Sequence, residues 1–444
     1  MKKLTWMAGF IMASNALANL HLAPPALNVS EGTAVFVDFI KVESTISYDV
    51  GKRTTTAVSK IRFEQKESGF PIFDLVNSPE KIILNQQNVD SSTTSMNGIS
   101  SVRYLKKDLA PGIYDVEIEN SFSTNVVYSG NEVKSAFWMS DLSDRRYIEQ
   151  YLPTNLEFDQ YQSQIEYKIL GSEREHVIYT NGTVQEIDKN HWQVTYPEVY
   201  TASSYFFHLT PKGIIPEQKA IFESIDGRKI PVTVYSQQST SRFMNATLEI
   251  LKELERDYGA WPHAQVIVYG AGMGGMEHCG ATITSFSALG HELIHSYFAR
   301  GVMPAHGNSG WVDEAIASWR DANYASYSSR SLSRTRMAAH SEYQRTTDRD
   351  AYTKGMRFIG YLNSKFNNQE SFKTFLRSFF QEQKFKPFKT EDFKAAIELF
   401  YNDDVSDEFN TYIYGKNGID QDKSAPVENP FHPRLSPEQL LQLL

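Results

Sequence analysis

Two histidines stand four positions apart in the segment GHELIHSYFAR, residues 290–300, and a glutamate directly follows the first of them. On a helix, residues four apart lie on the same face, one turn from each other. His291 and His295 would therefore point the same way and could share one metal ion, at about 2 Å from each imidazole nitrogen. Glu292 would stand beside that ion, within reach of a water molecule bound there. The spacing predicts a metal-binding helix that carries its own general base.

A third ligand is needed, because catalytic zinc takes three protein ligands and keeps one open position. Glu314 follows His295 with 18 residues between them, in the helical-looking segment GWVDEAIASW, 310–319. Its neighbours are large and apolar, and an unpaired carboxylate among them would be costly. We therefore expect Glu314 to complete a site for one Zn²⁺ per chain. Without that ligand, the two histidines could equally lie on an ordinary helix face, and Glu314 could be a surface carboxylate.

The arrangement of HExxH, 18 residues and W-x-x-E resembles the aminopeptidase N family of gluzincin zinc peptidases. Two further segments carry the resemblance. YGAGMGGMEHCG (269–280) is similar to the family's G-x-M-E-N segment, and YTKGMRFIGYL (352–362) is similar to its Y-x-K-G helix. The resemblance extends over most of residues 140–415 and is strongest over 265–362. It implies a zinc peptidase that removes residues from the amino terminus of peptides.

The resemblance also implies roles for individual residues. Glu292 would be the general base that takes a proton from water, and the hydroxyl of Tyr352 would stabilise the developing oxyanion. The chain has 24 tyrosines, and only the YTKG context selects Tyr352.

The substrate would be held by the segment that precedes the zinc helix. Glu277 would bind its free amino terminus, which limits cleavage to the first residue. Gly274, Gly275 and Met276 would line the path of the substrate backbone, because glycines allow a close approach.

The chain also departs from the family pattern. His278 stands where the family has asparagine, so the segment reads GGxEH, a form more similar to a sister gluzincin family that acts on N-terminal glycine or small residues. No counterpart is apparent for the large C-terminal helical domain of longer relatives, and we expect a short form of the enzyme. These differences leave the metal chemistry intact and bear on substrate size.

The surrounding pattern predicts a multidomain protein of class β plus α+β. Residues 31–235 are rich in Val, Ile, Tyr, Phe and Thr between turn signals, which favours an antiparallel β domain over 19–228. A thermolysin-like catalytic domain with a helical lobe is expected over 229–420, followed by a tail over 421–444. Helical spacing is found over 241–259, 285–300, 311–327, 349–366, 369–381 and 390–402. Thr390 is the expected N-cap of the last of these helices.

Composition limits the setting in which the protein works. Lys2 and Lys3 precede an apolar run that ends in ALA at 16–18, the pattern of a signal peptide over 1–18, so we expect export to a bacterial periplasm or medium. The formal charge of −9 and the lack of a basic stretch argue against nucleic-acid binding. No membrane span is expected after signal cleavage. The single cysteine, Cys279, excludes an internal disulfide.

Three functions are compatible with this sequence. The first is a zinc aminopeptidase acting on peptides with a free amino terminus. The second is a zinc endopeptidase with the same metal and base, which has no use for Glu277 as an amine anchor. The third is a non-catalytic peptide-binding protein on the same scaffold. The sequence does not determine the oligomeric state or the preferred first residue.

Overall fold

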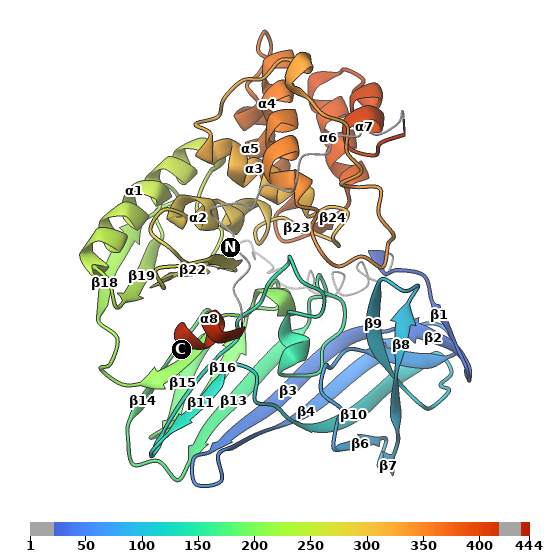
Figure 1. Cartoon of the computed structure of the whole chain (residues 1–444), viewed down its shortest axis with the longest axis vertical. Helices are drawn as coiled ribbons and strands as arrows, with labels where there is room; N and C mark the ends of the chain where they lie inside the picture. Colours follow the sequence, from blue (N-terminus) through green and yellow to red (C-terminus); the bar gives the residue numbers. More distant parts are fainter. Residues whose placement is uncertain (1–21, 417–436) are drawn as a thin grey trace, which may run out of the picture.

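The computed structural model of the chain describes residues 22–416 and 437–444, and forms two lobes (Figure 1). The predicted signal peptide lies outside the described residues, as does most of the predicted tail. In Figure 1 the large sheets of the N-terminal lobe fill the lower half, and helices α1–α7 lie above them. Among the described residues, no helix is both long enough and apolar enough to cross a membrane. The expected class, a β domain followed by a thermolysin-like domain with a helical lobe, is confirmed.

The N-terminal lobe contains three sheets, with strand orders β1-β2-β5-β9-β8, β15-β16-β13-β3-β4-β10-β6-β7 and β11-β12-β17-β14. The strands are β1 (Leu27–Val29), β2 (Gly32–Phe36), β3 (Asp38–Asp49), β4 (Thr54–Gln65), β5 (Phe70–Phe73), β6 (Lys81–Leu84), β7 (Gln87–Asn88), β8 (Ser91–Met96), β9 (Ser100–Leu105), β10 (Gly112–Ser121), β11 (Val126–Ser129), β12 (Glu132–Ala136), β13 (Gln162–Leu170), β14 (His176–Thr180), β15 (Thr183–Asp188), β16 (His191–Tyr196) and β17 (Phe207–Pro211).

The longest strands of this lobe show why they form a sheet with one buried face. In β3 and β4 buried and more exposed residues alternate, so that Ile46 and Ile61 face the same core. Most pairings are antiparallel, as expected. However, β13 pairs with β3 in parallel, which joins the two halves of the lobe and could not be read from local sequence.

The second lobe is built on a five-stranded sheet with the order β18-β19-β20-β22-β21. Its strands are β18 (Glu217–Glu223), β19 (Lys229–Ser236), β20 (Val266–Gly270), β21 (Gly275–His278) and β22 (Ala281–Thr284), and a separate pair is formed by β23 (Met303–Pro304) and β24 (Pro387–Phe388). Every residue of β20 is buried, in keeping with its parallel neighbours on both sides. Since β18 pairs with β19, we propose a lobe boundary before Glu217 rather than at residue 228.

The helices of this lobe lie on one side of the sheet, and the first two of them pack directly against its strands (Figure 1). They are α1 (Thr240–Tyr258), α2 (Leu289–Phe298), α3 (Trp311–Asp321), α4 (Met356–Lys365), α5 (Phe372–Gln383), α6 (Thr390–Tyr401) and α7 (Ser406–Tyr412), with a π-helical turn η5 (Ala351–Gly355) before α4. Helix α1 begins at the cap Ser239 and ends at Gly259, whose φ of 103° favours glycine. The expectation that Thr390 caps α6 is wrong, because Lys389 is the N-cap. The hydroxyl of Thr390 instead donates to Asn308 O.

A separate apolar cluster joins the two lobes. It includes Trp138 and Phe206 from the β domain and Tyr269 from the opposite face of the second sheet. Helix α8 (Pro437–Gln442) leads into the same cluster, in which Leu443 is 3% exposed. The hydroxyl of Tyr269 donates to Leu443 O at 2.7 Å. Residues far apart in sequence therefore hold the lobes together beside the sheet that carries the site.

Candidate metal centre

Helix α2 holds both histidines of the HExxH segment inside the protein. His291, Glu292 and His295 are at most 1% exposed. The two imidazole rings face the same side, with centroids 4.9 Å apart, as the spacing of four predicts. Burial of three polar side chains on one helix turn requires polar partners, since isolated charges are strongly disfavoured inside a protein.

Helix α3 brings the third expected ligand to these histidines. Oε2 of Glu314 lies 3.2 Å from Nε2 of His291 and 3.6 Å from Nε2 of His295. One ligand atom from each of the three residues lies within 4.8 Å of the others. Two imidazoles and one carboxylate are the donor set of catalytic zinc sites. The residues present therefore fit a zinc ion.

Two aspartates, not foreseen from the sequence, lie behind the histidines. Nδ1 of His291 is 2.7 Å from Oδ2 of Asp321, and Nδ1 of His295 is 3.8 Å from Oδ2 of Asp313. A carboxylate at Nδ1 fixes the tautomer that leaves Nε2 for a metal. Although burial acts against it, hydrogen bonds with Asp321 and Glu314 raise the pKa of His291 well above its usual value. The sequence did contain a clue to Asp321. It lies seven residues after Glu314, so a helix places both carboxylates on one face, two turns apart.

The carboxylate of Glu292 lies against the edge strand β21. A Cβ added to Gly275 would lie 2.7 Å from the carboxyl carbon of Glu292, so only glycine fits there without displacing that carboxylate. The preceding residue, Gly274, has a φ of 67°, which also favours glycine. The side chain of Met276 points the other way, into the core of the β domain. The two glycines thus set the approach of β21 to the expected general base.

Tyr352 lies in the π-helical turn η5, not in the regular helix expected over 349–366. Its hydroxyl donates to Oε1 of Glu314 at 2.7 Å. Burial, together with the nearby Glu314 carboxylate, raises the pKa of Tyr352 well above its usual value. The hydroxyl therefore stays protonated and remains a hydrogen-bond donor beside the His–His–Glu cluster. Single π turns within helices often occur at functional sites.

Glu277 has a buried partner that sequence reasoning missed. Nη2 of Arg300 donates to its Oε1 at 2.8 Å, and both side chains are buried. Within the described part of the chain, Oε2 of Glu277 has no hydrogen-bond partner. The guanidinium thus compensates much of the Glu277 charge while leaving one oxygen as an acceptor. Arg300 lies two residues after the end of α2, and nothing in the sequence spacing linked it to Glu277.

His278 and Cys279 follow Glu277 into the interior and are fully buried. Burial, with Arg300 nearby, lowers the pKa of His278 to about 3, so its imidazole is neutral. Burial raises the pKa of Cys279 to about 12, so its thiol is protonated. Neither residue belongs to the His–His–Glu cluster, and both are core residues of this structure.

A scan against protein-family models gave no match, and a search of the curated proteins gave none. Solved structures do match. An M1 zinc metallopeptidase from Deinococcus radiodurans has 14% identity and a TM-score of 0.60, with 82% of this chain and 90% of that chain covered. Yeast LTA4 hydrolase in complex with bestatin has 14% identity and a TM-score of 0.64, with 89% and 69% covered. Legionella pneumophila aminopeptidase A has 14% identity and a TM-score of 0.62, with 85% and 50% covered. The chain therefore has the fold of the M1 zinc metallopeptidases and carries a buried His–His–Glu cluster within it.

Proposed function

We propose that this protein is a zinc aminopeptidase, which binds one Zn²⁺ per chain and removes residues from the free amino terminus of peptides. The observation that carries the proposal is the buried cluster of His291, His295 and Glu314, with all three ligand atoms within 4.8 Å of one another. The fold shared with M1 zinc metallopeptidases supports the same chemistry. At 14% identity this likeness concerns the fold, and the site residues carry the functional argument.

The side chains around the cluster suit peptide hydrolysis. When bound, zinc supplies a Lewis acid that polarises a carbonyl and lowers the pKa of water. In this proposal Glu292 accepts the proton that the attacking water loses and passes it to the leaving amine. Tyr352 donates a hydrogen bond to the oxygen on which charge develops, a role that its present contact with Glu314 supports. When substrate binds, the Tyr352 hydroxyl would donate its hydrogen bond to the substrate oxygen instead of to Glu314. The Glu314 carboxylate would then be available to bind the metal.

The edge strand β21 offers a binding path for the substrate. Among the described strands it pairs only with β22, so its other side can receive an extended peptide. Oε2 of Glu277, at the end of this path, can accept a hydrogen bond from a free ammonium group. An amine anchor beside the metal cluster limits cleavage to the first peptide bond, which favours an aminopeptidase.

One observation favours the endopeptidase alternative. Arg300 compensates the charge of Glu277 through a buried ion pair at 2.8 Å, which weakens the attraction of that carboxylate for an ammonium group. An endopeptidase would use the same zinc ion, Glu292 and Tyr352, but would also cleave peptides whose amino terminus is blocked.

A panel of aminoacyl fluorogenic substrates, each assayed beside its N-acetylated copy, tests the proposal. We expect hydrolysis of the free-amine substrates only, with loss of activity in chelator and in Glu292→Gln. Glu186→Gln, a change at an exposed glutamate of β15, should keep full activity. Cleavage of the acetylated copies would support the endopeptidase. A protein that binds zinc but cleaves nothing would refute the enzyme and leave a peptide-binding protein.

We also propose that the protein acts after export, as the N-terminal sequence predicts. N-terminal sequencing of the protein recovered from a bacterial periplasm or medium should give Asn19. An intact N-terminus on cytoplasmic protein would contradict this.

A further inference from the structure

A small cavity lies between the lobes beside Glu277. Its volume is about 50 Å³. The edge strand contributes Glu277, helix α3 contributes Asp313, and the segment before Tyr352 contributes Thr347. From the β domain come Asp141 and Tyr147, among other residues. The cavity thus borders the expected amine anchor and the neighbour of a metal ligand.

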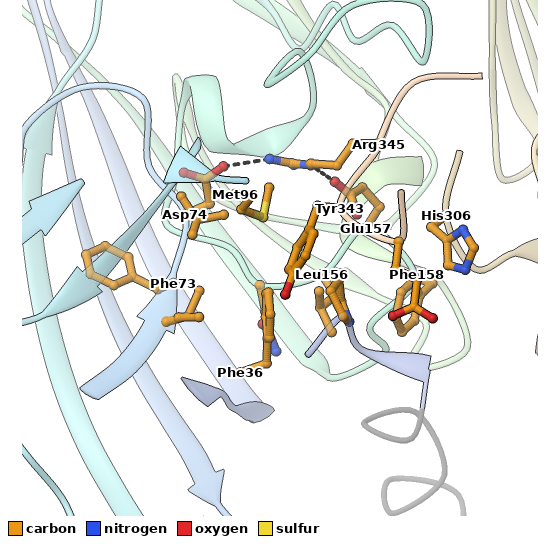
Figure 2. A pocket seen from close by; sticks show the side chains of 15 residues that line it. Phe36, Phe73, Asp74, Met96, Leu156, Glu157, Phe158, His306, Tyr343 and Arg345 are labelled. Atoms are coloured by element: carbon orange, nitrogen blue, oxygen red, sulfur yellow. Dashed lines mark hydrogen bonds and ion pairs between the residues drawn. The ribbon is translucent and has the colours of Figure 1, made fainter. Parts of the chain in front are cut away.

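The size of the cavity limits what can enter it. A water molecule needs about 10–15 Å³ of such volume, so a cavity of this size holds about three to five non-hydrogen atoms. Its wall includes Arg345, which pairs with Asp74 at 2.8 Å, with Glu149 at 3.4 Å and with Glu157. Figure 2 shows two of these ion pairs, those of Arg345 with Asp74 and with Glu157. It draws the lining of a second, apolar cavity of about 30 Å³, to which Tyr343 contributes. These buried ion pairs keep the cavity from expanding around a larger side chain, because breaking them would leave charges unpaired.

The charges in the lining also select against some side chains. Four carboxyl groups face two guanidinium groups, those of Arg300 and Arg345. Both guanidinium groups already form ion pairs with carboxylates, so neither is available to balance an incoming carboxylate. An acidic side chain would therefore meet an excess of negative groups. The charges thus exclude acidic side chains, while the small volume of the cavity excludes the long basic ones.

Tyr147 supplies an uncommitted polar group. Its main chain is held at both ends, because its N–H donates to Oε1 of Glu149 at 3.0 Å and its carbonyl accepts from Nε2 of Gln150 at 3.2 Å. Among the described residues, nothing forms a hydrogen bond with its hydroxyl, which lies in the lining of the cavity. Nε of Arg300, which also lines the cavity, is buried without a partner in that part of the chain. A buried polar group without a partner is costly, so the cavity favours a ligand that can form hydrogen bonds.

We propose that this cavity receives the first side chain of the substrate and selects small hydrogen-bonding side chains, serine above all, with Tyr147 as the specificity-determining residue. The proposal rests on the proposed aminopeptidase function. The amine and the side chain of the first residue share one Cα, so an amine bound at Glu277 directs that side chain into the adjoining cavity. A serine hydroxyl fits the volume, carries no charge and can pair with Tyr147. Leucine, phenylalanine and arginine exceed the volume or fill it without hydrogen bonds.

The test compares serine and alanine, which differ by one hydroxyl. We expect kcat/KM for seryl substrates to exceed that for alanyl substrates about 3- to 10-fold, the effect of one hydrogen bond. Phenylalanyl, arginyl and aspartyl substrates should be at least about 100-fold poorer than seryl ones. In Tyr147→Phe the serine-to-alanine ratio of kcat/KM should fall to near one, because the lost hydrogen bond is made by the seryl substrate. If Tyr147 had a purely structural role, Tyr147→Phe would lower kcat/KM for both substrates equally, and the serine-to-alanine ratio would not change.

A matched control and a binding measurement separate this proposal from the function on which it rests. Tyr343→Phe removes a hydroxyl from the neighbouring apolar cavity and should leave the ratio unchanged. Calorimetry with serinamide and alaninamide measures their binding affinities, and so tests the preference for serine over alanine without turnover. A preference for serinamide that Tyr147→Phe abolishes, in a protein that cleaves nothing, would support the cavity and refute the peptidase. Turnover with an unchanged ratio in folded Tyr147→Phe, or equal turnover of phenylalanyl substrates, would overturn the cavity proposal.

Discussion

The carboxylate of Asp321 allows a direct test of the metal centre that does not depend on catalysis. Its Oδ2 accepts a hydrogen bond from Nδ1 of His291 at 2.7 Å. Asp321→Asn keeps the shape of the side chain but removes the charge that fixes the tautomer and increases the basicity of Nε2. Loss of such a contact weakens metal binding by about 10- to 100-fold, or about 1.4–2.7 kcal/mol. We expect a loss of zinc affinity within this range.

Asp313→Asn is the matched control. Its Oδ2 lies 3.8 Å from Nδ1 of His295, beyond hydrogen-bond distance, so we expect a change in zinc affinity below about threefold. Both variants can be titrated with zinc in competition with a chromogenic chelator, and their folding checked by circular dichroism.

The structure also predicts how zinc affinity depends on pH. Because the pKa of His291 is raised, zinc must displace its proton, and apparent affinity should increase with pH.

The reasoning about Asp321 would be refuted by a folded Asp321→Asn variant that binds zinc within twofold of the original protein. It would also be refuted if Asp313→Asn caused the larger loss. Either outcome would mean that the hydrogen bond to His291 does not set the affinity of the site, whatever the protein does to peptides.

Three further predictions concern other parts of the molecule. Gly275→Ala should displace the carboxylate of Glu292 and lower kcat by about 100-fold with zinc content unchanged, as measured by turnover and metal analysis; full activity would contradict the close approach. Burial, with Asp38 nearby, raises the pKa of Asp159 to about 8, so the folded state holds a proton that the unfolded state loses near pH 4. Stability should therefore fall by roughly 1.4 kcal/mol per pH unit between about pH 4 and 8, and urea unfolding should show a flatter profile in Asp159→Asn. Leu443→Ala should lower stability by about 2 kcal/mol or more, because the side chain is buried between the lobes, and an unchanged melting temperature would argue against that packing.

Much of the metal centre follows from local sequence. The spacing of His291 and His295 places both rings on one face of any helix, and the apolar neighbours of Glu314 place it inside. These are consequences of helix geometry and of the cost of burying charge, which need no knowledge of the fold. The order of a β-rich half and a helical half was readable for the same reason, since periods of two and 3.6 residues mark strands and helices.

Other features depended on contacts between distant segments. The parallel pairing of β13 with β3 and the place of β18 in the second sheet are decided by strand partners, which local patterns do not specify. The π-helical turn at Tyr352 also departs from the regular helix that the local pattern predicted.

The surroundings of Glu277 were decided by tertiary structure alone. Arg300 reaches Glu277 across 23 positions of sequence, and Tyr147 reaches the same cavity from the other lobe. The sequence by itself predicted a cluster of two histidines and one glutamate, and the structure brings these three residues together. Only the tertiary structure decided the size and charge of the space beside it, because a cavity is defined by the side chains that several elements leave between them.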